Sequence, residues 1–239
     1  MLELSFLHKD QLRAVRFAAI VSFISCMMIT AASSGLKHRQ LENIELDKQK
    51  NILKAAGLID DSKPVDKSVI KSLFDTQITH LALDGEGQAI AAPTPDSLNL
   101  YLHRLDSRII SFIIPIDSRG LWGKINGYIA LAADGETVVG FSIYSHSETP
   151  GLGGEIEKQW FSKNFVGKKI VNATGQFVSV AIAKGKVTPA SGDVELNTVD
   201  GISGATLTGK YLSEGIKIIL EQYEPVSVRF RQGDYTGFK

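Results

Sequence analysis

The chain has 239 residues, 44% of them hydrophobic and 22% charged, a composition typical of one sizeable folded domain with an appendage. Its 26 basic side chains balance its 26 acidic ones, so charge gives no indication of a nucleic-acid partner. Cys26 is the only cysteine, which excludes an intrachain disulfide and a metal or iron–sulfur site built from several thiolates.

Residues 17–36 form an apolar stretch without a charged side chain. At about 1.5 Å per residue, a helix of this length spans roughly 30 Å, the thickness of a bilayer's hydrocarbon core. We therefore predict one transmembrane helix. A cleaved signal peptide is the alternative, although its apolar region is usually shorter, about 7 to 15 residues. Basic residues are nearly equal in number on the two sides, so charge bias does not set the orientation.

Two helices are expected after this stretch. Residues 38–58 place apolar side chains at helical spacing among many charges and end at Gly57, which predicts a helical stalk that stops there. After a loop around Pro64, residues 67–79 repeat the amphipathic pattern. Both helices are interpreted as scaffold.

Strand signals follow a turn-rich region, 84–99, which holds a short strand at most. Residues 109–116 and 125–133 are rich in β-branched and aromatic side chains, as are residues 137–145. The turn at 134–135 predicts that the last two of these strands form a hairpin. Imperfect alternation is expected where helices cover one face of the sheet.

The rest of the chain predicts a helix at 156–165, a strand at 176–182 and a helix at 209–223. The last helix has apolar residues at spacings of three, four and seven, so one face packs inward. The predicted fold class is α+β: a single N-terminal transmembrane helix, then a domain with an antiparallel sheet flanked by helices.

The predicted hairpin runs directly into a glycine-rich loop, Ser-Glu-Thr-Pro-Gly-Leu-Gly-Gly-Glu, at 147–155. Its glycines let backbone N–H groups approach a flat ring or a phosphate closely, while Leu152 offers an apolar cap and Glu148 and Thr149 offer polar groups. An ordinary connection from strand to helix is the alternative.

A second small-residue segment, Asp-Gly-Ile-Ser-Gly-Ala-Thr at 200–206, directly precedes the last predicted helix. The start of that helix offers unpaired N–H groups and a partial positive charge, which favour a phosphate. Ser203 and Thr208 are within reach for phosphate hydrogen bonds. The alternative is that they are turn residues, and that Thr206 or Thr208 caps the helix.

A third segment, Gly-Leu-Trp-Gly at 120–123, lies between two predicted strands. The indole of Trp122 is suited to stack on a flat aromatic ring, and a tryptophan buried in the core is the alternative interpretation. Histidines are scattered, and no second histidine or cysteine stands at ligand spacing from His146, so we predict no metal site.

Together these segments resemble one family. Asp-x-x-Ser-Gly-Ala-Thr resembles the site at which a flavin transferase esterifies a threonine with the phosphate of FMN, and Thr206 would be that threonine. The segments at 120–123 and 147–155 match, in order and rough spacing, other fixed segments of the C subunit of the sodium-translocating NADH:quinone oxidoreductase. The G subunit of the Rnf electron-transport complex is similar around the same motifs and is the alternative.

The resemblance implies a covalent FMN and the residues around it. The implied FMN-binding residues are Thr206, Ser203, Gly204, Thr208, Glu148, Thr149, Leu152, Gly153 and Trp122. Asp200 would serve the modification step, where the transferase and its divalent metal act on the threonine; a structural Asx turn is the alternative. No residue is expected to be catalytic, because Thr206 is modified once and is then a tether.

The resemblance also implies an organisation and a role. Residues 1–16 would be a cytoplasmic segment, 17–36 the transmembrane helix, 37–80 a helical stalk and scaffold, and 81–239 the FMN-binding domain, outside the inner membrane of a bacterium. The expected function is electron relay in a sodium-exporting NADH:ubiquinone reductase. Its expected partners are the other subunits, membrane lipid and, during maturation, the flavin transferase. A non-respiratory FMN-binding module is a further alternative.

Overall fold

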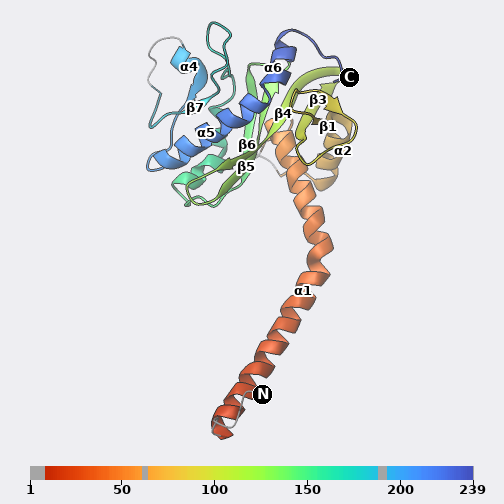
Figure 1. Ribbon diagram of the computed structural model, residues 1–239, viewed down its shortest axis with the longest axis vertical. Helices are drawn as coiled ribbons and strands as arrows, with labels where there is room; N and C mark the ends of the chain where they lie inside the picture. The colour runs from red at the N-terminus through yellow and green to blue at the C-terminus, as the bar shows by residue number, and fades with distance from the viewer. Residues whose placement is uncertain (1–8, 61–63, 188–192, 239) are drawn as a thin grey trace. The chain divides into compact units, whose positions relative to one another are not determined.

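The computed structural model describes residues 9–60, 64–187 and 193–238 (Figure 1). The chain divides into two units, residues 1–46 and 47–239, and the division falls inside the helix α1 (Lys9–Ala55). The predicted membrane stretch and the predicted stalk are therefore parts of one continuous helix.

In the first unit, α1 exposes its apolar side chains. Phe17 is 71% exposed and Phe23 is 70% exposed. Within the described ranges, α1 is the one helix long and apolar enough to cross a membrane. Side chains of this kind are stabilised by lipid and not by water, which agrees with the transmembrane prediction for this part of the helix.

In the second unit, α1 ends as predicted at Gly57, whose φ is +75°. The N–H of Gly57 donates to the carbonyl of Lys54 at 3.0 Å, and the N–H of Leu58 donates to that of Leu53 at 2.9 Å. This pair of bonds is a Schellman motif, which requires a left-handed residue and so favours glycine.

The second unit is built on a six-stranded antiparallel sheet. Its spatial order is β2 (Ala89–Ile90), β1 (Ile78–Leu83), β3 (Leu98–Leu105), β4 (Arg108–Arg119), β5 (Lys124–Ala132) and β6 (Val138–Ser145). The predicted hairpin is confirmed, because β5 pairs with β6 and Tyr128 lies opposite Ser142. The structure thus has the predicted α+β class.

Helices pack on the sheet and complete the core. The remaining elements are α2 (Lys67–Gln77), η2 (Gly153–Glu157), α3 (Gln159–Lys163), β7 (Ala181–Ile182), α4 (Asp193–Asn197), β8 (Thr198–Val199), α5 (Thr206–Gln222) and α6 (Glu224–Arg231). Figure 1 shows α5 running across the sheet, where it contacts β4. Its inward face carries the predicted apolar residues, including Leu212, Ile216 and Leu220, all fully buried.

The opposite side of the sheet is also covered at β6, in agreement with the predicted sheet flanked by helices. Phe141 and Ile143 of β6 belong to the core cluster, so the alternate residues Gly140 and Ser142 point to the other side. There the Oγ of Ser142 donates to Oδ1 of Asn51 at 3.0 Å, and Gly140 packs against the backbone of Ala55. Burial on both sides explains why the strands show so little alternation.

Three further differences concern the extent of elements. Strands β1 and β3 were not predicted, and β1 begins inside the range 37–80 assigned to scaffold. The predicted helix at 156–165 is a 3₁₀ turn followed by a short α-helix. The predicted strand at 176–182 is regular only at its end, where β7 pairs with β8 in parallel.

Candidate functional site

The Asp-Gly-Ile-Ser-Gly-Ala-Thr segment is held from beneath by an upstream loop. Oδ1 of Asp200 accepts a hydrogen bond from the N–H of Val187 at 2.7 Å, and the N–H of Gly201 donates to the carbonyl of Gly185 at 2.8 Å. Gly201 packs so closely on the backbone of Ala183 that a Cβ would clash there. The start of the segment is therefore fixed before the chain reaches Thr206.

The segment then alternates between anchored and exposed residues. Ile202 and Ala205 are buried, and the N–H of Ala205 donates to the carbonyl of Ile202 at 3.1 Å. Ser203, Gly204 and Thr206 are exposed. Gly204 has a φ of +76°, a backbone conformation that favours glycine. This turn leaves Thr206 exposed at the surface.

Thr206 is the first residue of α5, three residues before the predicted start. The preceding residue, Ala205, has no side chain that could cap the helix. The structure excludes the alternative that Thr206 or Thr208 caps α5, because Thr206 is already helical and the hydroxyl of Thr208 donates to Glu148. The first turn keeps its positive dipole end without a side-chain cap.

The glycine-rich loop folds back on itself and meets the threonine segment. The N–H groups of Leu152 and Gly154 both donate to the carbonyl of Thr149, at 3.1 and 2.9 Å. Gly151, which lies between Thr149 and Leu152, has a φ of +74°. This turn places Leu152, 44% exposed, against Gly204, where a Cβ would lie 2.8 Å from Cδ2 of Leu152.

Glu148 connects all three segments from below. Its side chain is buried, with the residue only 4% exposed. Oε1 accepts from the N–H of Trp122 at 3.0 Å, and Oε2 accepts from the hydroxyl of Thr208 at 2.5 Å. Gly153 is also buried here, since a Cβ on it would lie 2.6 Å from Oγ1 of Thr208. Glu148, Gly153 and Thr208 therefore lie beneath the exposed part of the site.

The surface above them is largely apolar. Trp122 is 69% exposed, which rules out the alternative of a buried core tryptophan. It lies in a tight loop, where the N–H of Gly120 donates to the carbonyl of Gly123 at 2.7 Å, and it lines a hollow formed by residues 117–124. Leu121 and Leu207 are also exposed. Neither leucine was predicted to belong to the site. Leu207 lies outside the apolar stripe of α5, and this position in the helical pattern is the signal that it faces away from the core.

Charged groups at the rim of this region are paired. His146 Nε2 lies 3.3 Å from Oε2 of Glu157, and Lys158 donates to Oε1 of Glu157 at 3.0 Å. The Lys158 hydrogen bond lowers the pKa of Glu157. Within the ranges the structure describes, no group of three or more His, Cys, Asp or Glu is placed to hold a metal ion.

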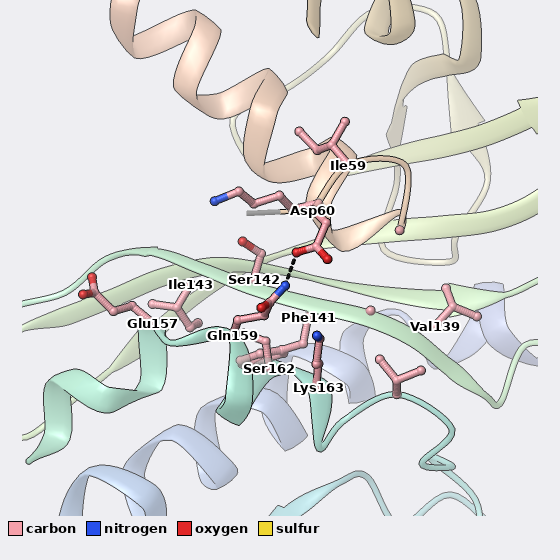
Figure 2. Close-up of a pocket in the computed structure, with 14 residues that line it drawn as sticks. Ile59, Asp60, Val139, Phe141, Ser142, Ile143, Glu157, Gln159, Ser162 and Lys163 are labelled. Atoms are coloured by element: carbon pink, nitrogen blue, oxygen red, sulfur yellow. Dashed lines mark hydrogen bonds between the residues drawn. The ribbon is translucent and has the colours of Figure 1, made fainter. Parts of the chain in front are cut away.

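A second pocket lies apart from these segments (Figure 2). It is formed by the end of α1 and the residues after it, by β6 and by α3. Figure 2 shows Gln159 donating a hydrogen bond to Asp60 across the pocket. Lys163 and Glu157 line the same wall as Gln159, the wall formed by η2 and α3. The pocket contains no residue of the three segments and was not predicted.

The geometry and a family comparison agree on the class of the protein. The family model described as an FMN-binding domain matches residues 120–221, a range that begins at the Trp122 loop and ends in α5. All three converging segments fall inside it. The fold and the site thus define a flavoprotein of the FMN-binding-domain class, preceded by a helix able to anchor it in a membrane.

Comparison with complete relatives is more specific. The C subunit of the Na(+)-translocating NADH-quinone reductase from Pseudomonas aeruginosa is 34% identical over 230 aligned residues, covering 83% of this chain and 87% of the relative. The C subunit from Pasteurella multocida is 31% identical, covering 95% of this chain and 98% of the relative. The chain belongs to the family formed by the C subunits of the Na(+)-translocating NADH-quinone reductase.

Solved structures support the fold. The crystal structure of the C subunit from Parabacteroides distasonis superposes with a TM-score of 0.68 at 29% identity, covering 80% of this chain and 96% of that one. The structure of the corresponding protein from Shewanella oneidensis superposes with a TM-score of 0.66 at 21% identity, which speaks for the fold alone.

Proposed function

We propose that this chain is the membrane-anchored electron-relay subunit of a sodium-exporting NADH:ubiquinone reductase and that it carries FMN esterified to Thr206. One observation carries the covalent part of the proposal. Thr206 is exposed at the start of α5, its helix has no side-chain cap, and it ends the segment Asp-x-x-Ser-Gly-Ala-Thr. A hydroxyl in that position suits attachment of a phosphate.

The first turn of α5 fits the phosphate of FMN. A phosphodiester on Thr206 would keep one negative charge, which the N-terminal end of a 17-residue helix stabilises. The exposed Ser203 and the side-chain-free Gly204 leave this end accessible. Thr208 is less suited to contact the phosphate, since its hydroxyl is buried and donates to Glu148.

The neighbouring apolar surface fits the flavin ring. Leu152 is exposed on a loop that packs against Gly204, and Thr149 lies exposed beside it. Trp122 is exposed on a loop that is joined to the first turn of α5 through Glu148. An aromatic side chain and an aliphatic one suit the faces of a flat ring, and Thr149 adds a polar group for orientation. Bound there, FMN supplies the electron-transfer chemistry, while the chain holds it and sets its surroundings.

The same exposure suits maturation. A flavin transferase must reach the hydroxyl of Thr206, and the exposed residues Ser203, Gly204 and Thr206 form a surface for it. Asp200 is held by the N–H of Val187, so we assign it to presenting the segment to the transferase. Esterification adds FMN and releases one water, and Thr206 then serves as a tether.

The names of the relatives support the assembly that we propose. The chain would act with the other subunits of the reductase, with α1 in the lipid of a bacterial inner membrane, the N-terminus in the cytoplasm and the FMN-binding domain on the periplasmic side. NADH would bind elsewhere in the complex, because the sequence has no Gly-x-Gly-x-x-Gly after a strand. The apolar stretch 17–36 has no ionisable group that suits a sodium path.

The proposal is tested by flavin retention after denaturation. The full chain is produced with a flavin transferase, and the flavin fluorescence of its band is measured on a denaturing gel. We expect fluorescence in the wild type and in Thr76→Ala, which removes an exposed hydroxyl on α2 outside the three segments, and none in Thr206→Ala. Equal fluorescence in Thr206→Ala would move the link to another residue, and its absence from the wild type would refute the covalent proposal.

A further inference from the structure

Glu148 is a buried carboxylate that lacks a positively charged partner among the described residues. It is 4% exposed, and its bonds are to the N–H of Trp122 and the hydroxyl of Thr208, both of which are neutral donors. Burying a carboxylate in this way costs free energy compared with an apolar side chain of similar size. A structural role for the two hydrogen bonds that Glu148 accepts would explain why a buried carboxyl group occupies this position.

The two bonds join the Trp122 loop to the first turn of α5, in addition to the packing of α5 on β4, where Oγ of Ser118 donates to the carbonyl of Tyr211 at 3.4 Å. Trp122 lies 26 residues before Glu148, in the loop after β4, and Thr208 lies 60 residues after it, in the first turn of α5. The bond from Thr208 has an O···O distance of 2.5 Å, at the short end of the range for a hydroxyl donor. One carboxylate therefore ties the Trp122 loop to the start of α5.

The surrounding glycines are shaped around this carboxylate. A Cβ on Gly153 would lie 2.7 Å from Oε2 of Glu148, and a Cβ on Gly120 would clash with Oε1. Neither glycine has a positive φ, so backbone conformation does not require glycine at these positions. The close approach of Glu148 is what requires glycine there, because a Cβ would collide with its carboxyl oxygens.

We propose that Glu148 is a positioning residue, which clamps the Trp122 loop to the first turn of α5 and so sets the indole relative to Thr206. Thr208 is two residues from Thr206 on the same turn, so a displacement of one moves the other. The part of this inference that concerns the flavin rests on the proposed function. The clamp itself is a property of the chain without FMN.

The clamp is tested first in protein that carries Thr206→Ala and so has no esterified flavin. Amide hydrogen exchange of the peptide containing Trp122 is measured in the full chain in detergent. We expect Glu148→Gln and Thr208→Val each to speed exchange at Trp122 roughly tenfold, because each weakens or removes a hydrogen bond of the bridge between Trp122 and Thr208. Thr208→Ser keeps the hydroxyl, so in this variant the peptide containing Trp122 should exchange at the rate of the Thr206→Ala parent.

The positioning role is tested with Thr206 present, by the rate of flavin attachment in the presence of a transferase. Glu148→Gln and Thr208→Val should each slow attachment roughly tenfold, the double variant should be no slower than either single variant, and Thr208→Ser should match the wild type. If the role of Glu148 were purely structural, the variants would lower thermal stability, but the single and double variants would not slow flavin attachment to the same extent.

Unchanged exchange at Trp122 in Glu148→Gln would overturn the clamp. Faster exchange with an unchanged attachment rate would overturn the positioning role. Failure of the proposed function is recognised separately, because the wild type itself would then carry no flavin in the attachment assay, whatever residue stands at 148.

Discussion

Leu152 packs against Gly204, although the two residues are far apart in the sequence. A Cβ on Gly204 would lie 2.8 Å from Cδ2 of Leu152. This contact brings the glycine-rich loop onto the turn that precedes α5. It shows that the two segments form a single surface, to which Thr206 belongs.

Gly204→Ala should disturb the site more than it disturbs the fold. Gly204 has a φ of +76°, so a side chain there costs about 1 kcal/mol of unfolding free energy. Leu152 is exposed and can move away, so crowding adds little to that cost. Displacing Leu152 should, however, slow flavin attachment. Thermal unfolding and attachment rate are the two measurements.

Gly175→Ala is the matched control. Gly175 has a φ of +78° and nothing within 4 Å of its Cβ position. It should lose a similar amount of stability and attach flavin at the wild-type rate. If both variants attach flavin equally well, the contact between Leu152 and Gly204 has no part in the site.

Trp122→Ala should leave stability within about 0.5 kcal/mol of the wild type, because a side chain that is 69% exposed contributes little packing. Flavin fluorescence should rise, since an indole stacked on the ring quenches it. Trp160→Ala is the control, because Trp160 is 47% exposed on α3, outside the three segments, and its indole donates to Glu155 at the far end of the glycine-rich loop. An equal response of the two variants would exclude stacking by Trp122.

Gly140→Ala should destabilise the second unit by about 1 to 3 kcal/mol. A Cβ on Gly140 would clash with the carbonyl of Ala55, a backbone atom that cannot turn aside. Gly185→Ala has open space and no positive φ, so it should change stability by less than about 0.5 kcal/mol. Equal melting temperatures for the two variants in detergent would contradict the packing of α1 on β6.

His103 predicts a weak acid sensitivity of the fold. It is 7% exposed on β3, and burial lowers its pKa below the usual value. As pH falls below about 6.5, the unfolded chain binds a proton that the folded chain does not yet bind, so the free energy of unfolding decreases. The decrease ends when pH passes the lowered pKa of the folded state.

His103→Gln should remove this component. The measurement is the melting temperature between pH 7.5 and 5, compared for the wild type and the variant. A wild type that loses no more stability than the variant over this interval would contradict the burial of a neutral histidine.

The parts of the fold that were predicted are those with strong local signals. An uncharged stretch of bilayer length identified the apolar part of α1, and the turn at 134–135 identified the hairpin. β3 was missed although Leu98, Leu100 and Leu102 alternate, because the turn-rich region before it was extended to residue 99. The covering of both sides of the sheet depends on Asn51 and Ala55, which no local pattern relates to β6.

The sequence analysis named candidate site residues, but it did not separate those that lie at the surface from those that lie buried beneath it. Sequence does not show that Thr206 and Leu152 are exposed while Glu148 and Thr208 are buried, because that depends on how distant segments meet. A threonine near the start of a helix suggests an N-terminal cap. Thr208 does not cap α5, because its hydroxyl donates a hydrogen bond to Glu148 instead. The bond joins residues 60 positions apart, beyond any local signal.

The most direct test of the central claim is the intact mass of the full chain, produced with an active flavin transferase, followed by peptide mapping. We expect a gain equal to FMN minus one water, located on the peptide that contains Thr206 and absent from Thr206→Ala. An unmodified mass, or the same gain on a different peptide, would contradict the assignment of Thr206 as the tether.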